Sequence, residues 1–167
     1  MPQSDQGLTR RRYMLVPRTL IFLRRADSFL LIKGAPTKRL WPNKYNGLGG
    51  HVERGEDVLS AAQRELREET GLEADLWLCG TVVIDAGLAQ PGICLYVFGG
   101  ENSRGALQNS MEGTAEWVPF DQIGALAAVE DLPALLSKVF SMKRGDAPFS
   151  ARSFYDVNQN LQVEFGK

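Results

Sequence analysis

One stretch of the chain decides the fold class, and it is residues 50–72, which read GHVERGEDVLSAAQRELREETGL. Its second half predicts a helix over residues 58–70. Gly71 supplies the stop, because glycine accepts the left-handed conformation at a helix C-terminus. At about 100° per residue, three apolar side chains share one helix face, which we expect to pack on a sheet. These are Leu59, Ala62 and Leu66.

Three carboxylates of the same helix fall within a neighbouring arc of about 100°. Glu65, Glu68 and Glu69 are spaced by three and four residues, so their charges repel one another. A helix tolerates this cluster most easily when a cation neutralises it. Hard oxygen ligands on one face suit Mg²⁺ or Mn²⁺ better than zinc. The alternative is a solvated acidic face with ordinary Arg–Glu pairs.

The loop that leads into the helix is suited to close contact with a ligand. Gly49 and Gly50 let the backbone approach a metal ion or a phosphate, and their carbonyls can add an oxygen ligand. Arg64 can pair with Glu56 and hold the loop against the helix. Arg64 can also pair with Glu68, one turn further along.

The spacing of these residues is itself informative. Residues 50–72 match the pattern Gly-x5-Glu-x7-Arg-Glu-(apolar)-x-Glu-Glu-x-Gly-(apolar) at every specified position. At an average usage of roughly 6% per residue type, a chance match has a probability on the order of 10⁻¹⁰ per starting position. This pattern is the Nudix box, and the chain therefore resembles the Nudix hydrolases.

The resemblance implies a fold and a chemistry. The fold would be α/β, as an α/β/α sandwich with a mixed central sheet. The reaction would be attack of water on a phosphorus atom of a nucleoside diphosphate linked to a further group. Glu65, Glu68 and Glu69 would hold Mg²⁺, or alternatively Mn²⁺, with help from the carbonyl of Gly49.

The same resemblance implies roles for the remaining box residues. Glu56 and Arg64 would orient the loop and the helix. The general base of the family is not fixed. It is a box glutamate, for which Glu65 is the candidate here, or an acid from a distant loop.

Two further segments look like those of MutT-type enzymes, the Nudix hydrolases that clear oxidised purine nucleoside triphosphates. In the run Asn46-Gly47-Leu48-Gly49-Gly50, the resemblance implies that Asn46 reads the purine edge, which suits the donor and acceptor of an amide. Glu112, five residues before Trp117, would be the loop glutamate that reaches the metal site. The alternatives are a simple turn at Asn46 and a plain surface acid at Glu112.

In the same group of enzymes, acids near the second helix bind the base. Glu130 and Asp131 fall close to that place, although Asp131 can instead cap the helix that Pro133 begins. His51 is the only histidine and is expected at the surface. Four aromatic side chains can either stack on a base or pack in the core, namely Trp41, Tyr45, Trp117 and Phe120.

The rest of the chain mixes strand and helix patterns. Such a mixture predicts one α/β domain over residues 14–167, behind a flexible tail at residues 1–13. The final two strands form a hairpin that can extend the sheet, contact a second subunit or rim the pocket. The expected strands cover residues 19–23, 28–32, 77–84, 93–98, 116–118, 153–157 and 161–165, and a second helix covers residues 132–142.

Composition narrows the function classes. With 167 residues and a net charge of −1, nothing favours a nucleic-acid polymer or an anionic membrane as partner. No run approaches the ~18 apolar residues of a membrane span, and the N-terminus lacks the apolar stretch of a signal peptide, so we expect a cytoplasmic protein. Cys79 and Cys94 are expected to be buried free thiols. A monomer and a homodimer both stay open.

These observations predict Mg²⁺-dependent hydrolysis of a nucleoside triphosphate to the monophosphate and pyrophosphate. An oxidised purine nucleotide such as 8-oxo-dGTP is a candidate substrate. A second prediction is hydrolysis of ADP-ribose or another nucleoside diphosphate derivative. A third is a catalytically silent nucleotide-binding regulator, but such a domain would be expected to have lost box carboxylates, and all of them are present here.

Overall fold

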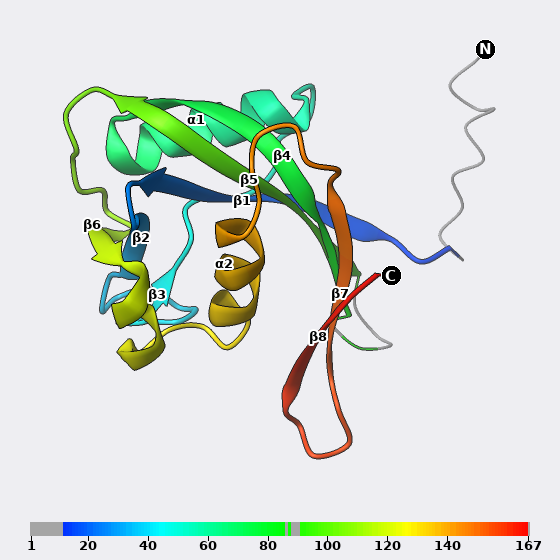
Figure 1. Ribbon diagram of the computed structural model, residues 1–167. Coiled ribbons are helices and arrows are strands. Elements are labelled where there is room, and N and C mark those ends of the chain that lie inside the picture. Colours follow the sequence, from blue (N-terminus) through cyan, green and yellow to red (C-terminus); the bar gives the residue numbers. More distant parts are fainter. Residues whose placement is uncertain (1–11, 86, 88–90, 167) are drawn as a thin grey trace, which may run out of the picture.

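Strands and helices alternate along the chain and form one layered structure (Figure 1). The computed structural model describes residues 12–85, 87 and 91–166. In chain order the elements are β1 (Leu15–Arg25), β2 (Ser28–Gly34), β3 (Tyr45–Asn46), α1 (Val58–Thr70), β4 (Glu73–Ile84), β5 (Gly92–Arg104), β6 (Gly113–Pro119), the 3-10 helix η2 (Phe120–Ala125), α2 (Leu132–Phe140), β7 (Phe149–Tyr155) and β8 (Leu161–Phe165).

The strands of the described residues form one mixed sheet of eight. Its order is β3-β2-β1-β5-β4-β7-β8, and β6 pairs with β2. The pairs β1–β5 and β4–β7 are parallel, and the other pairs are antiparallel. The C-terminal hairpin β7–β8 therefore extends the sheet beyond β4, which is one of the three roles left open by its sequence.

Strand β1 shows why the sheet needs a helix on each face. Successive side chains of a strand point to opposite faces, and here both sets are apolar and buried. Leu20 and Phe22 pack in the core under α2, whereas Ile21 and Leu23 pack in the core under α1. Figure 1 shows the two helices on opposite sides of the sheet. The predicted α/β/α sandwich with a mixed central sheet is confirmed.

Helix α1 has the bounds that the sequence predicts. The Asp57 side chain caps its start by accepting hydrogen bonds from the N–H groups of Leu59 and Ser60, at 2.9 and 3.0 Å. Gly71 ends it with φ of 70°. Ala62 and Leu66 are buried as expected, but the prediction for Leu59 is wrong, because that side chain is 40% exposed. The buried residues of α1 begin at its second turn. Periodicity predicts which side of a helix is apolar, but not how far the sheet reaches beneath it.

Several strands are longer than the apolar pattern predicts. Residues 99–104 lie beyond the predicted strand 93–98, but they continue β5 because they pair with residues 73–77 of β4. Backbone hydrogen bonds between strands form regardless of side-chain polarity, so a strand can extend beyond its apolar residues. Helix α2 ends at Phe140, two residues earlier than predicted, and η2 was not predicted.

Three other expectations have mixed outcomes. Cys79 and Cys94 are both free, but only Cys79 is buried, and Cys94 is partly exposed. The predicted tail falls mostly on residues 1–11, outside the described residues, and a single domain over residues 14–167 stays a prediction. Among the described residues, no helix combines the length and the apolarity that crossing a membrane requires.

Candidate active site

A pocket of about 340 Å³ gathers most of the predicted site residues. The segments that supply them are β3, the loop before α1 (residues 47–57, the approach loop), α1, the loop before β6 and the start of α2. The residues are Asn46, Gly49, Glu65, Glu69, Glu112 and Asp131. The other predicted site residues are not in its lining, namely Glu56, Arg64, Glu68 and Glu130. The pocket therefore joins segments that are far apart in the sequence.

The three box carboxylates differ sharply in exposure. Glu69 is only 5% exposed, whereas the Glu68 side chain is 61% exposed and does not line the pocket. The Glu65 side chain has an intermediate exposure of 14%. The N–H of Gly49 donates to Glu69 Oε2 at 2.7 Å, which ties the approach loop to the helix.

Burial makes Glu69 a poor host for an uncompensated negative charge. Desolvation raises the pKa of Glu69 to about 8, and the charges of Glu112 and Glu65 add to that shift. The Gly49 N–H acts in the opposite direction. A cation in the pocket would favour the ionised carboxylate.

Arg64 links the loop and the helix, and both pairings considered from the sequence are present. It donates to Glu56 at 2.8 and 3.0 Å and to Glu68 at 3.1 Å. It also donates to Glu65 at 2.9 Å and to the backbone carbonyl of His51 at 3.0 Å. The hydrogen bonds that Glu56 accepts from Arg64 and from the Glu53 N–H hold the pKa of Glu56 below its ordinary value.

We expect Arg64→Lys to lower kcat/KM about 10–100-fold, the usual cost of losing a group that orients metal ligands. A single ammonium cannot replace the planar fork that reaches Glu56, Glu65 and His51 together. The measurement is steady-state turnover across a Mg²⁺ titration, with Arg67→Lys on the same helix as the control. Within the described part of the chain, Arg67 pairs with the exposed Glu73 alone, at 3.3 Å. Equal turnover of the two variants would contradict this role for Arg64.

The two glycines of the approach loop are required by close contacts. A Cβ on Gly50 would lie 2.5 Å from Glu65 Oε1, and one on Gly49 would lie 2.4 Å from the backbone oxygen of Thr19. The carbonyl of Gly50 accepts from the Thr19 N–H at 2.8 Å. The carbonyl of Gly49 accepts no hydrogen bond from any described residue, which leaves it available to a ligand.

The donor set fits a hard cation in chemical type. The pocket presents carboxylates from Glu65, Glu69 and Glu112. Among residues 12–85, 87 and 91–166, no three acidic, histidine or cysteine side chains already form a metal-ligating group. Two of these carboxylates contact basic side chains, because Arg64 donates to Glu65 at 2.9 Å and Lys38 Nζ donates to Glu112 Oε2 at 2.7 Å. A bound metal ion would take the place of these basic side chains as the positive charge beside Glu65 and Glu112.

Two candidates for base recognition, Asn46 and Asp131, also line the pocket. Asn46 lies in β3, not in a simple turn, and its Oδ1 accepts from the Gly47 N–H at 2.8 Å. Asp131 occupies the N-cap position of α2, as the capping alternative expects, but its side chain makes no capping hydrogen bond. Burial raises the pKa of Asp131 above its ordinary value, and the charge of Glu130 adds to it. Glu130 itself is exposed.

Other pocket residues were not predicted as site residues from the sequence, except Trp41, which was one of four stacking candidates. Lys38, Trp41 and Arg18 line the pocket, as does His51, which is exposed as expected. Of the four aromatic candidates for stacking, only Trp41 is in the lining, and it is 48% exposed. Arg18, Lys38 and Trp41 lie outside the box, and His51 occupies one of its unspecified positions, so the pattern assigns a role to none of them.

The family model of the NUDIX domain matches residues 14–139. The chain belongs to the Nudix hydrolase family. This Nudix hydrolase is 31% identical over 106 residues to the oxidized purine nucleoside triphosphate hydrolase of Danio rerio, across 63% of this chain and 67% of that relative. It is 28% identical over 136 residues to the NAD-capped RNA hydrolase NudC of Stutzerimonas stutzeri (strain A1501), across 80% of this chain and 47% of NudC.

The fold of this Nudix hydrolase also matches solved structures. The mutator MutT protein from Bacillus halodurans superposes with a TM-score of 0.76 at 22% identity, over 90% of this chain and 97% of that one. At this identity the match establishes the fold. Nudix hydrolases generally use divalent metal ions such as Mg²⁺ and act on nucleotides.

Proposed function

We propose that this Nudix hydrolase converts a nucleoside triphosphate to its monophosphate and pyrophosphate, with Mg²⁺ held by the carboxylates of α1. One observation carries the proposal: Asn46 and Asp131 line the same pocket as the α1 carboxylates Glu65 and Glu69. A nucleotide can therefore present its base to one group and its phosphates to the other. The relative from Danio rerio, an oxidized purine nucleoside triphosphate hydrolase by name, supports this substrate class.

The proposed ligands are Glu65, Glu68, Glu69 and the Gly49 carbonyl. Bound Mg²⁺ would supply charge neutralisation at the phosphates and a more acidic water. Glu68 is exposed and paired with Arg64, so its carboxylate has to turn toward the pocket to join the set. Glu56 and Arg64 hold the loop and the helix in register. Glu112 is the proposed second acid of the site, at the cost of its contact with Lys38.

Base recognition is proposed for Asn46 and Asp131. The amide of Asn46 offers a donor and an acceptor side by side. A carboxyl with a raised pKa keeps its proton more readily, so Asp131 can offer the same pair of functions. An oxidised purine, which carries additional donors and acceptors on its edge, suits this pair. Trp41 is the proposed stacking partner, and Glu130 is exposed and has a weaker case for base contact.

The test is pyrophosphate and phosphate release with Mg²⁺ from a panel of ordinary and 8-oxo-purine nucleoside triphosphates, ADP-ribose and a dinucleoside polyphosphate. We expect fast pyrophosphate release from a triphosphate. Asp131→Ala is expected to raise KM for the preferred purine about 10-fold or more, because a buried partner is lost. Asp121→Ala, an exposed acid of η2, is the control. Unchanged base preference in Asp131→Ala would contradict its role.

A second candidate is hydrolysis of a nucleoside diphosphate derivative. It is favoured by the match to NudC, which spans 80% of this chain and which by its name acts on NAD-capped RNA. Cleavage confined to ADP-ribose or the dinucleotide would select this candidate and overturn the triphosphate proposal.

The remaining parts of the proposal concern the setting of the enzyme. We propose a small-molecule nucleotide as the partner, with no nucleic-acid polymer or membrane involved, and action in the cytoplasm. Cell fractionation with an antibody to the chain tests the location, and light scattering of the purified protein decides between a monomer and a homodimer.

A further inference from the structure

We propose that Arg18, oriented by His51, binds the terminal phosphates of the substrate at the end of the pocket opposite Asn46. The proposal rests on the proposed triphosphate substrate. It makes Arg18 a binding residue that selects for the length of the phosphate chain. Arg18 lies in β1, outside the Nudix box, and lines the pocket.

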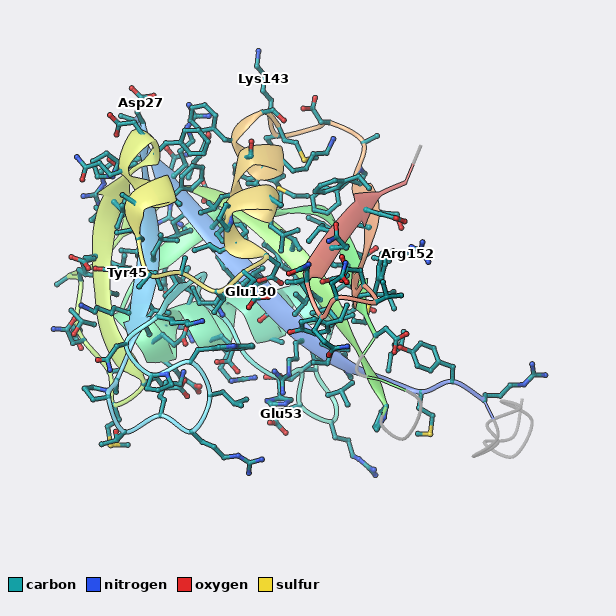
Figure 2. All side chains as sticks on the ribbon, turned by 90° about the horizontal axis from the view of Figure 1, so that it is seen from below. Asp27, Tyr45, Glu53, Glu130, Lys143 and Arg152 are labelled. Carbon is teal, nitrogen blue, oxygen red and sulfur yellow. The ribbon has the colours of Figure 1, made fainter. Side chains whose placement is uncertain are left out.

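The segment from Asn46 to His51 sets the direction of the pocket. Asn46 pairs with Ile32 of β2, whereas His51 bridges Arg18 of β1. At about 3.3 Å per residue, an extended segment of this length spans roughly 16 Å, comparable to an extended nucleoside triphosphate. In Figure 2, Tyr45, next to Asn46, stands well apart from Glu53, which follows His51 by two residues.

The carboxylates of α1 contact the middle of this segment. The Gly49 N–H donates to Glu69, and Gly50 lies against the Glu65 carboxylate. Asp131 belongs to the Asn46 end, because the neighbouring Val129 N–H donates to the Tyr45 carbonyl at 3.0 Å. The order along the pocket is therefore base candidates, carboxylates, then Arg18 with His51. A nucleoside triphosphate has the same order of base, reacting phosphates and terminal phosphates.

The contacts of Arg18 leave its phosphate-binding groups unused. Its Nε donates to His51 Nε2 at 3.1 Å, which sets the plane of the guanidinium. Among the described residues, its two terminal nitrogens have no hydrogen-bond partner, and no carboxylate lies within ion-pair distance. Lys38 is the other positively charged lysine or arginine in the pocket lining, and it contacts Glu112 of the loop before β6, not His51. A guanidinium fork with both ends available suits bidentate binding of phosphate.

The charge of the pocket explains why such a group is needed. Its lining contains five acids, namely Glu53, Glu65, Glu69, Glu112 and Asp131, against Arg18 and Lys38. Metal ions at the α1 carboxylates can compensate for the phosphates that they contact. A phosphate beyond them faces Glu53, so binding there requires a cation that the protein supplies. Arg18 is the half-buried cation at that position.

The experiment measures binding of inorganic pyrophosphate and, separately, of a nucleoside monophosphate, by calorimetry with Mg²⁺ present. We expect Arg18→Ala to weaken pyrophosphate binding about 10-fold or more, the usual worth of a hydrogen-bonded charge pair, with monophosphate binding unchanged. Arg18→Lys should recover part of the loss. Arg54→Ala, an exposed charge of the same loop region outside the pocket lining, is the control for long-range electrostatics.

His51 gives an independent readout. His51→Ala should weaken pyrophosphate binding less than Arg18→Ala, and the double variant should be no worse than Arg18→Ala alone, because His51 acts through Arg18. Additive losses would overturn the positioning role of His51.

Two outcomes overturn the assignment of Arg18. One is equal weakening of pyrophosphate and monophosphate binding by Arg18→Ala, which would place Arg18 at the nucleoside. The other is no change in pyrophosphate binding. Pyrophosphate binding that depends on Arg18, in a protein that cleaves only ADP-ribose or a dinucleotide, would support the anion site and overturn the proposed triphosphate function. The two proposals therefore fail separately.

Discussion

Replacing Glu69 with glutamine is expected to lower turnover at least on the order of 100-fold while the fold is retained. Glu69 is the most buried of the box carboxylates and is the one that the approach loop contacts directly. Glutamine keeps the size of the side chain and an oxygen for the Gly49 N–H, but removes the negative charge that a metal ion needs. Turnover of the variant with saturating Mg²⁺ measures the loss of activity, and its circular dichroism measures the retention of the fold.

The matched control is Glu73→Gln. Glu73 is an exposed acid that follows α1 and pairs with Arg67, and it does not line the pocket. We expect near-normal turnover in this variant. Near-normal turnover in Glu69→Gln would instead contradict the metal-ligand assignment, since a buried ligand cannot be neutralised without loss of metal affinity.

The same substitution should stabilise the metal-free protein at high pH. The pKa of Glu69 is raised from 4.5 to about 8, so the folded state keeps a proton that the unfolded state loses. Stability contributed by this group is therefore present below about pH 4.5 and is lost as the pH rises toward 8. In EDTA, Glu69→Gln should have a higher Tm than the wild type at pH 8 and a similar Tm at pH 4.5. Added Mg²⁺ should raise the Tm of the wild type alone.

Replacing Gly49 with alanine is expected to destabilise the protein by about 3 kcal/mol or more and to remove activity. Gly49 has a backbone φ of 127°, which residues with a side chain rarely adopt. A Cβ there would also lie 2.4 Å from the Thr19 backbone oxygen, which belongs to β1 and cannot rotate away. The approach loop would have to leave the sheet edge, which would break the contact from Gly49 to Glu69.

Substitutions at two other glycines separate the cost of the positive φ from the cost of the close contact. Gly55 has φ of 92° but no atom within 4 Å of an added Cβ, so Gly55→Ala should show the conformational cost alone, about 1 kcal/mol. Gly50→Ala meets the Glu65 carboxylate, a side chain that can move, so the fold should survive while Mg²⁺ affinity falls. Urea unfolding and Mg²⁺ titration measure these effects. A Gly49→Ala variant as stable as Gly55→Ala would contradict the close-contact argument.

The parts of the site that depend on local rules could be predicted from the sequence. Helix α1 has the predicted bounds, because its cap at Asp57 and its stop at Gly71 act within one turn of the helix. The ion pairs of Arg64 with Glu56 and Glu68 could likewise be predicted from the positions of these residues in the box. The sandwich followed from the box and from the mixture of strand and helix patterns.

Contacts between distant segments were beyond the sequence. Lys38 meets Glu112 across 74 residues, and Arg18 meets His51 across 33. No periodicity marks these pairs, since each side chain comes from a different strand or loop. The same is true of Asp131, whose place in the pocket depends on the Val129–Tyr45 contact between two loops.

The sequence by itself determined the family, the helix that carries the carboxylates, and the chemical type of the ligands, because these depend on residue identity and on spacing within one helix. The tertiary structure alone decided which carboxylate is buried. Glu68 and Glu69 are neighbours on one predicted face, yet one is exposed and the other enclosed. Burial depends on where the sheet and the approach loop meet the helix, and that is set by packing between segments that the chain order does not bring together.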